Sequence, residues 1–168
     1  LTKSVQPIDV ATKSAATAIA IPDPGCSNGA SRPWALEIND GIVYVGVVCD
    51  AASGTAADLA AFVYGYNPTS ATLPLAGGEG TLAPATWSAN LIADADADSG
   101  VQLDYTKGCA YQTTIGCGWN PWEFTYTNSE FNTPSWGASR PQPMLTDIEV
   151  DDDGSLVLAF ADRTGFQF

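Results

Sequence analysis

Alternating apolar and polar positions predict a β-hairpin in the first third of the chain. Trp34, Leu36 and Ile38 alternate with smaller or polar residues, the pattern of a strand with one buried face. Asn39-Asp40-Gly41 suits the positive φ angles of a tight turn, and the β-branched run 42–48 is typical of a strand covered on both faces. We therefore expect Leu36 and Ile38 to face the core.

A second hairpin repeats this order near the end of the chain. Ile148 and Val150 alternate with acidic residues, Asp151-Asp152-Asp153-Gly154 forms a turn, and 155–160 is an aliphatic strand. Glu149 then corresponds to Glu37, and Ile148 and Val150 are expected to face the core. Hairpins that recur at a long interval are typical of radial β-sheet repeats. We expect an all-β fold of partial β-propeller type; a β-sandwich, with a chance likeness between two ordinary hairpins, is the alternative.

Other segments carry weaker signals. Residues 59–66 predict a strand, and 122–127 a further one. Residues 69–100 are rich in turn formers and predict loops, with one short strand near 87–92. Residues 1–20 show little periodicity and end before two prolines, so we expect an extended arm laid on a single all-β domain, 21–168.

Composition narrows the function classes. The 168-residue chain has 19 Asp and Glu against 6 Lys and Arg, a formal charge of -13 that repels nucleic acid and anionic membranes. It contains no His, which removes the usual general base and the commonest zinc ligand. We therefore expect no enzyme activity. The chain starts at Leu1 and not at Met, which suggests a processed product.

The four cysteines predict structural disulfides. Cys26, Cys49, Cys109 and Cys117 are even in number and form no C-x-x-C motif, so metal and redox sites are weakly indicated. We predict bridges Cys26–Cys49 and Cys109–Cys117, hence an extracellular or cell-surface location. Four buried free thiols in a cytosolic protein are the alternative.

Several segments carry a family resemblance. They are Ile21-Pro22-Asp23-Pro24-Gly25-Cys26, Ser31-Arg32-Pro33-Trp34, Tyr44-Val45-Gly46-Val47-Val48-Cys49, Trp119-Asn120-Pro121-Trp122, Pro141-Gln142-Pro143-Met144-Leu145-Thr146-Asp147-Ile148-Glu149 and Phe160-Ala161-Asp162-Arg163. From about residue 21 onward the chain resembles the β-propeller-like region of large secreted bacterial surface proteins that also carry SdrD B-like and repeat modules. The resemblance implies no catalytic residues and a chain that continues past Phe168.

Acidic residues offer the candidate metal ligands. Asp94, Asp96 and Asp98 alternate as in a calcium loop, but position 6 is Ser99 and position 12 is Tyr105, which departs from the EF-hand pattern. The alternative is a solvated acidic loop, and no other cofactor is expected. Asp151-Asp152-Asp153-Gly154 is interpreted as a hairpin turn.

Paired carboxylates raise a hydrolase hypothesis. Asp147 and Glu149 share one strand face, which is a poor geometry for flanking a glycosidic bond. A structural network with Arg163 or Arg32 is the favoured interpretation.

Aromatic residues give a third candidate site. Trp119, Trp122 and Trp136 either form a sugar-stacking platform or fill the core. A carbohydrate-binding module and a calcium-dependent or carboxylate-based hydrolase are therefore the rival hypotheses.

The favoured function is a non-enzymatic, secreted structural or adhesive module of a bacterial cell-surface or filamentous assembly. Two hairpins are too few to close a propeller, so strand edges would stay unpaired. We expect partners in other copies of the chain or in the rest of a larger polypeptide. The arm 1–20 and the terminal Phe166 and Phe168 are the expected contact segments, with no nucleic acid and no membrane insertion.

Overall fold

The computed structural model describes residues 3–69, 72–75, 78–81, 85–92, 100–103, 118–124 and 141–163. The fold is all-β and its sheets are antiparallel. Ala56–Asp58 forms a 3₁₀ turn, and within the described residues no helix is long and apolar enough to cross a membrane. The calcium candidates Asp94, Asp96 and Asp98, together with Cys109, Cys117, Trp136, Phe166 and Phe168, lie outside the described residues.

A five-stranded sheet forms the centre of the molecule. β5 (Ser31–Asn39) pairs with β6 (Ile42–Cys49), and β6 pairs with β7 (Ala60–Asn67). The short strands β10 (Thr86–Trp87) and β11 (Val101–Gln102) both pair with β7, so β5 is an edge strand. The predicted first hairpin and the strand near 59–66 are confirmed. The strand expected near 87–92 is represented by β10 alone.

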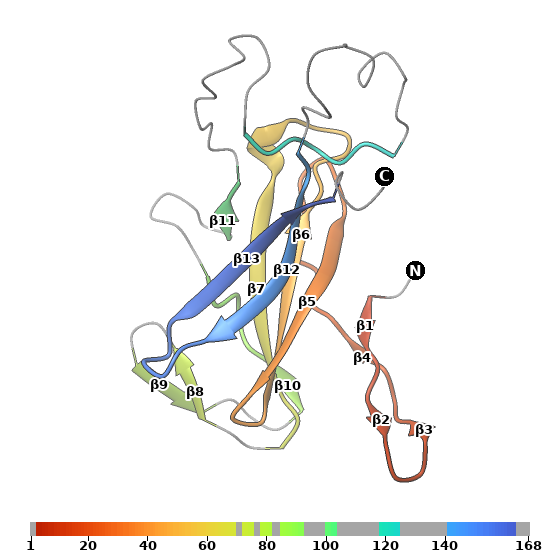
Figure 1. Ribbon diagram of the computed structural model, residues 1–168, viewed down its shortest axis with the longest axis vertical. Coiled ribbons are helices and arrows are strands. Elements are labelled where there is room, and N and C mark those ends of the chain that lie inside the picture. Colours follow the sequence, from red (N-terminus) through yellow and green to blue (C-terminus); the bar gives the residue numbers. More distant parts are fainter. Residues whose placement is uncertain are drawn as a thin grey trace.

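The second predicted hairpin is confirmed and packs against the first. β12 (Pro143–Val150) pairs with β13 (Leu156–Asp162) in a separate two-stranded sheet, and β12 lies against β5 and β6 (Figure 1). The two hairpins therefore face each other as layers. In the part of the chain that is described, no radial array of blades is seen.

The first core lies between these two layers. Tyr44, Val48 and Val63 from the central sheet pack with Leu145 and Ile148 from β12. Ile148 is fully buried, and Val150 packs against this core as predicted. A β-branched run such as 42–48 suits this position because its side chains fill both faces of a pleated sheet.

The predicted orientation of β5 is wrong. Trp34, Leu36 and Ile38 point away from β12 and are 65%, 50% and 62% exposed, whereas Ala35 is 2% exposed. A β-bulge sets this phase, because the register shifts between Pro33 and Leu36. The inner face there needs small residues, since a Cβ on Gly46 would meet Leu145 Cδ2 at 2.5 Å and Ala35 Cβ at 2.9 Å.

A second core covers the opposite face of the central sheet. Val45, Val47, Phe62 and Tyr64 are buried there, and Ile21, Cys26 and Trp87 pack onto them. β6 is thus covered on both faces, as its sequence predicts. Residues 21–30 run from this face of the sheet into β5. The segment that precedes the sheet therefore covers part of the second core.

The N-terminal residues form a ribbon that projects from the body (Figure 1). β1 (Ser4–Val5) pairs with β4 (Ile19–Ala20), and β2 (Ile8–Asp9) pairs with β3 (Ser14–Ala15). The sequence did not reveal these short strands. The base of the arm contacts the body, where Val5 packs against the second core, and the ribbon projects beyond it. A further small hairpin, β8 (Thr72–Leu75) with β9 (Gly78–Thr81), forms where loops were expected.

Candidate interaction surface

Three large apolar side chains form an exposed stripe on β5. Trp34, Leu36 and Ile38 stand on the face that also carries Val43 and Val45, because Leu36 pairs with Val45 and Ile38 with Val43. We call these three residues the β5 stripe. The stripe continues the second core outward onto solvent-exposed surface at the edge of the sheet. Clustered exposed apolar side chains of this kind mark interaction sites more often than isolated ones do.

A groove runs between the β5 stripe and the base of the arm. Val5 and Ile21 line it on the arm side, and Pro33, Trp34 and Leu36 line it on the side of β5. β5 is an edge strand, so the backbone along its outer side has no strand neighbour among the described residues. The groove is mostly apolar, with the polar Ser4 and Gln6 on the arm side, and a groove of this kind beside such a strand edge suits an extended segment that adds to a sheet.

Backbone and side-chain hydrogen bonds hold the arm in its extended shape. Ile21 N donates to Lys3 O at 3.0 Å, and Ala16 N donates to Pro7 O at 3.0 Å. Gln6 Nε2 donates to Ala16 O at 2.6 Å, and Lys3 Nζ donates to Ser31 Oγ at 2.5 Å. The arm is therefore tied to the start of β5 at its base, while its far end is free of the body.

The tip of the arm exposes apolar side chains. Val10 is 86% exposed and Ile8 is 62% exposed. Asp9 Oδ1 accepts hydrogen bonds from the backbone N–H groups of Thr12, at 3.1 Å, and Ala11, at 2.8 Å, which shapes the turn. These bonds, from Thr12 first, lower the pKa of Asp9. An ordered turn thus presents Ile8 and Val10 to solvent.

A disulfide fixes the segment that joins the arm to the sheet. Cys26 and Cys49 are bonded, with 5.3 Å between their Cα atoms, which confirms this predicted pair. The bridge attaches residue 26 to the end of β6 and is part of the second core. It closes a loop with a sequence separation of 23, which limits the freedom of the unfolded chain.

Asp50 forms a buried hub beside the disulfide. It is fully buried, and its Oδ1 accepts from Ala30 N at 2.8 Å and Ala52 N at 3.1 Å. Its Oδ2 pairs with Arg32 Nε at 2.6 Å. The sequence predicts a network of Asp147 and Glu149 with Arg163 or Arg32, but Arg32 pairs with Asp50 instead. Arg163 Nη1 donates to Gln142 Oε1 and to Glu123 O. The hub sets the path of residues 29–32 into β5.

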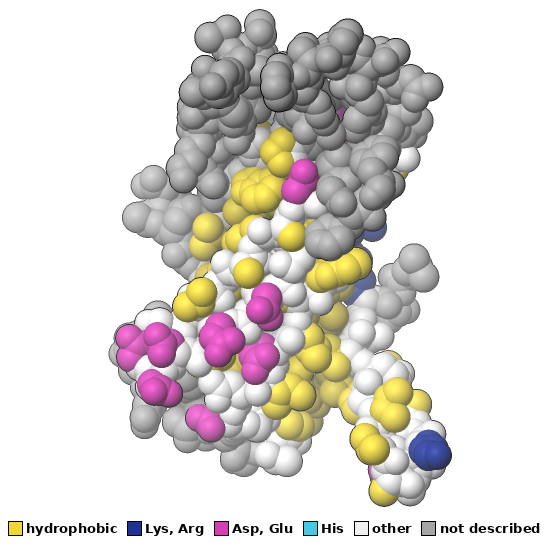
Figure 2. Space-filling model, viewed as in Figure 1, with side chains coloured by type: hydrophobic (Ala, Val, Ile, Leu, Met, Phe, Trp, Pro, Cys, Tyr) yellow, Lys and Arg dark blue, Asp and Glu magenta, His cyan; other side chains and the backbone are white. Residues whose placement is uncertain are grey.

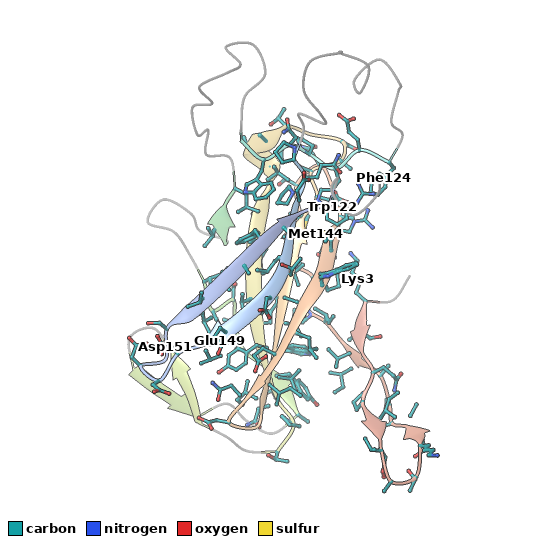
Figure 3. The ribbon with its side chains drawn as sticks, viewed as in Figure 1. Lys3, Trp122, Phe124, Met144, Glu149 and Asp151 are labelled. Atoms are coloured by element: carbon teal, nitrogen blue, oxygen red, sulfur yellow. A yellow bond between two sulfur atoms is a disulfide. The ribbon has the colours of Figure 1, made fainter. Side chains whose placement is uncertain are left out.

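Trp122 and Phe124 lie at one end of the sandwiched layers (Figure 3), and two arginines lie against their rings. The Arg32 guanidinium lies 5.5 Å from the Trp122 ring centroid and 5.1 Å from that of Phe124. The corresponding distances for Arg163 are 4.7 and 5.2 Å. Gln142, fully buried, accepts from Arg163 Nη1 at 2.6 Å. Cation–π contacts and these hydrogen bonds tie segment 118–124 to β5 and to the ends of β12 and β13.

The predicted aromatic residues occupy packed positions in this region. Trp122 is 7% exposed and its Nε1 donates to Pro143 O at 2.9 Å. Trp119 is partly buried against the first core. Residues 122–124 do not form the expected strand; Trp122 N instead donates to Asp50 O at 2.9 Å. The side chains of Trp119 and Trp122 thus attach segment 118–124 to the core.

The acidic residues of the second hairpin lie at the opposite end from Trp122 (Figure 3). Asp147 and Glu149 are exposed on one face of β12, opposite the buried Ile148. Asp151 N donates to Ser155 O at 2.9 Å, and Asp153 Oδ1 accepts from Ser155 N at 2.8 Å, so the acidic run forms a turn. The described residues contain no group of three or more acidic, His or Cys side chains placed to hold a metal ion.

Comparison with known proteins yields one distant similarity. No protein-family model and no solved structure matches the chain. Colossin-C of Dictyostelium discoideum is 26% identical over 149 residues, which is 88% of this chain. The chain spans 12% of the length of that curated relative. The matched region is thus a small part of a much longer polypeptide.

Proposed function

We propose that this chain is a non-enzymatic, extracellular interaction module within a cell-surface or filamentous assembly. The observation that carries the proposal is the exposed apolar surface formed by the β5 stripe and the tip of the arm. Its side chains, Trp34, Leu36, Ile38, Ile8 and Val10, are 50% to 86% exposed. Such exposure is unfavourable in water unless a partner covers it.

Covalent and electrostatic features support the extracellular part of the proposal. The Cys26–Cys49 disulfide persists in oxidising compartments and is rare in the cytosol. The net charge of -13 keeps copies apart except where a specific contact overcomes repulsion. The resemblance of several segments to secreted bacterial surface proteins is part of the proposal, and the similarity to a small part of Colossin-C supports a module inside a longer polypeptide.

The packing of the two hairpins favours a sandwich-like architecture over a partial propeller. β12 lies against both β5 and β6, and the first core fills the space between these layers. A propeller would place such hairpins in separate blades around an axis. Among the described residues, β5 has a strand neighbour on one side only, and the proposed contact surface lies at its other edge.

Localisation with thiol trapping tests the proposed function. Intact cells of the source are treated with a membrane-impermeant amine-reactive label, then lysed in the presence of an alkylating agent. We expect the protein to carry the surface label and to retain Cys26–Cys49 as a disulfide in peptide maps. An unlabelled protein with alkylated Cys26 and Cys49 would contradict the proposal, because it would place the chain in a reducing compartment.

A further inference from the structure

The charge of the chain is divided unevenly between arm and body. Residues 1–20 contain two Lys and one Asp, a net charge of +1. The remaining residues contain four Lys or Arg and 18 Asp or Glu, a net charge of -14. Figure 2 shows basic colour at the end of the arm and acidic colour over the β12–β13 hairpin. Lys3 is bonded to Ser31 at the base of the arm, and Asp9 balances Lys13 within residues 8–15, so Lys13 is the charge that the tip offers to an acidic surface.

The arm does not reach the groove of its own chain with its tip. Its base is one wall of that groove, through Val5 and Ile21. The backbone bond from Ile21 N to Lys3 O and the β1–β4 and β2–β3 pairing hold the ribbon straight, so the tip points away from β5. The exposed tip and the open groove are thus available only between molecules.

The tip of the arm and the β5 stripe match in chemistry. The tip offers the apolar side chains of Ile8 and Val10, with Lys13 in the same turn. The β5 stripe offers Leu36 and Ile38, and the exposed Asp40 follows two residues later in the turn after β5. Apolar contact beside a lysine–carboxylate pair would cover both exposed patches at once.

We propose that the arm of one copy docks its tip, residues 8–15, along β5 of a second copy, from the groove at Trp34 and Leu36 toward the turn at Asp40. Ile8 and Val10 cover the β5 stripe, and Lys13 faces Asp40. The proposal deepens the proposed function by naming the partner of the same surface, and it rests on that function. Donor and acceptor surfaces differ, so each copy keeps one free tip and one free groove. Such a contact repeats head to tail and produces open chains of copies.

Complementation between two defective variants tests the proposal with the full chain. Val10→Glu places a charge on the apolar tip and leaves the groove unchanged. Leu36→Glu places a charge in the groove and leaves the tip unchanged. Both positions are exposed, so folding should persist, and circular dichroism checks this. We expect the native protein to form a concentration-dependent series of oligomers in sedimentation velocity up to about 300 µM, where micromolar contacts are populated. Each variant alone should be monomeric, and their mixture should form a one-to-one dimer.

Charge reversal and a matched control complete the design. Lys13→Glu or Asp40→Lys alone should weaken association by about tenfold, and the double variant should recover most of that loss. Val157→Glu, at an apolar position of β13 with 57% exposure, should associate like the native protein. A native chain that stays monomeric, a mixture of variants that stays monomeric, or a charge-reversal pair without recovery would overturn the docking. The localisation experiment is unaffected by these results, so the two proposals fail separately.

Discussion

Gly46 of β6 lies directly against Leu145 of β12, so close that a Cβ at residue 46 would meet Leu145 Cδ2 at 2.5 Å. The contact brings the two sheets together over the first core. It also explains the phase of β5, because only the small Ala35 fits beside Gly46 on that side. The larger Trp34, Leu36 and Ile38 are consequently turned outward. One glycine therefore links the packing of the layers to the exposure of the proposed interaction surface.

Substituting Gly46 tests this relationship. Gly46→Ala should lower the free energy of unfolding by about 1–3 kcal/mol, because the added methyl group overpacks the interface between sheets. Urea unfolding measures the change. Adding Leu145→Ala should make the effect of Gly46→Ala smaller than it is in the native background. Equal effects in both backgrounds would show that the contact does not limit the sheet spacing.

Removal of the disulfide should weaken the fold through the unfolded state. Replacing Cys26 and Cys49 together by Ser should reduce the free energy of unfolding by about 3 kcal/mol, as expected for a loop of this length. Guanidinium unfolding of the double variant, compared with the native protein, measures it. Indistinguishable midpoints would mean that the bridge adds no stability.

Asp50 should matter more than any acidic residue of the second turn. Asp50→Asn removes the negative charge that pairs with Arg32, and its amide N–H groups would face backbone N–H groups that need an acceptor. The substitution should lower the free energy of unfolding by roughly 2–3 kcal/mol. Asp152→Asn, at an exposed turn position, is the matched control and should change the free energy of unfolding by less than about 0.5 kcal/mol. Thermal or urea unfolding distinguishes the two, and equal small effects would contradict the role of Asp50 as a hub.

The burial of Tyr44 should make the protein less stable at alkaline pH. Burial, with a smaller contribution from the negative charge of Asp40, raises the pKa of Tyr44 above its ordinary value of 10.0. A raised folded-state pKa gives stability that is complete below about pH 10 and is lost as the pH rises through the folded value. Urea unfolding between pH 8 and 12 should show this decline, and Tyr44→Phe should make it shallower. A decline of unchanged slope would contradict the prediction.

The sequence reveals most of the strands because their patterns are local. The run 42–48 and the turns at Asp40-Gly41 and Asp153-Gly154 carry strong β and hairpin signals, and both hairpins form. The orientation of β5 was not predictable from alternation alone. Large apolar residues normally face the core, but here a bulge and the approach of Leu145 to Gly46 decide the phase.

The candidate site depended on longer-range contacts. Strands of two residues, such as β2 and β3, are too short to produce a periodic pattern, so the projecting ribbon was missed. The Arg32–Asp50 pair was missed for a related reason, since β5 and β6 bring these residues together only after pairing. An aspartate directly after Cys49 and an arginine at the start of a strand are weak signals by themselves.

Hydrogen–deuterium exchange of the intact chain at low and high concentration tests the central claim most directly. The claim is that the arm and β5 form a surface that a partner copy covers. The account predicts slower exchange at high concentration in peptides covering residues 3–20 and 31–40, with unchanged exchange in a peptide from β13. Exchange that is the same at both concentrations in the arm and β5 would contradict it.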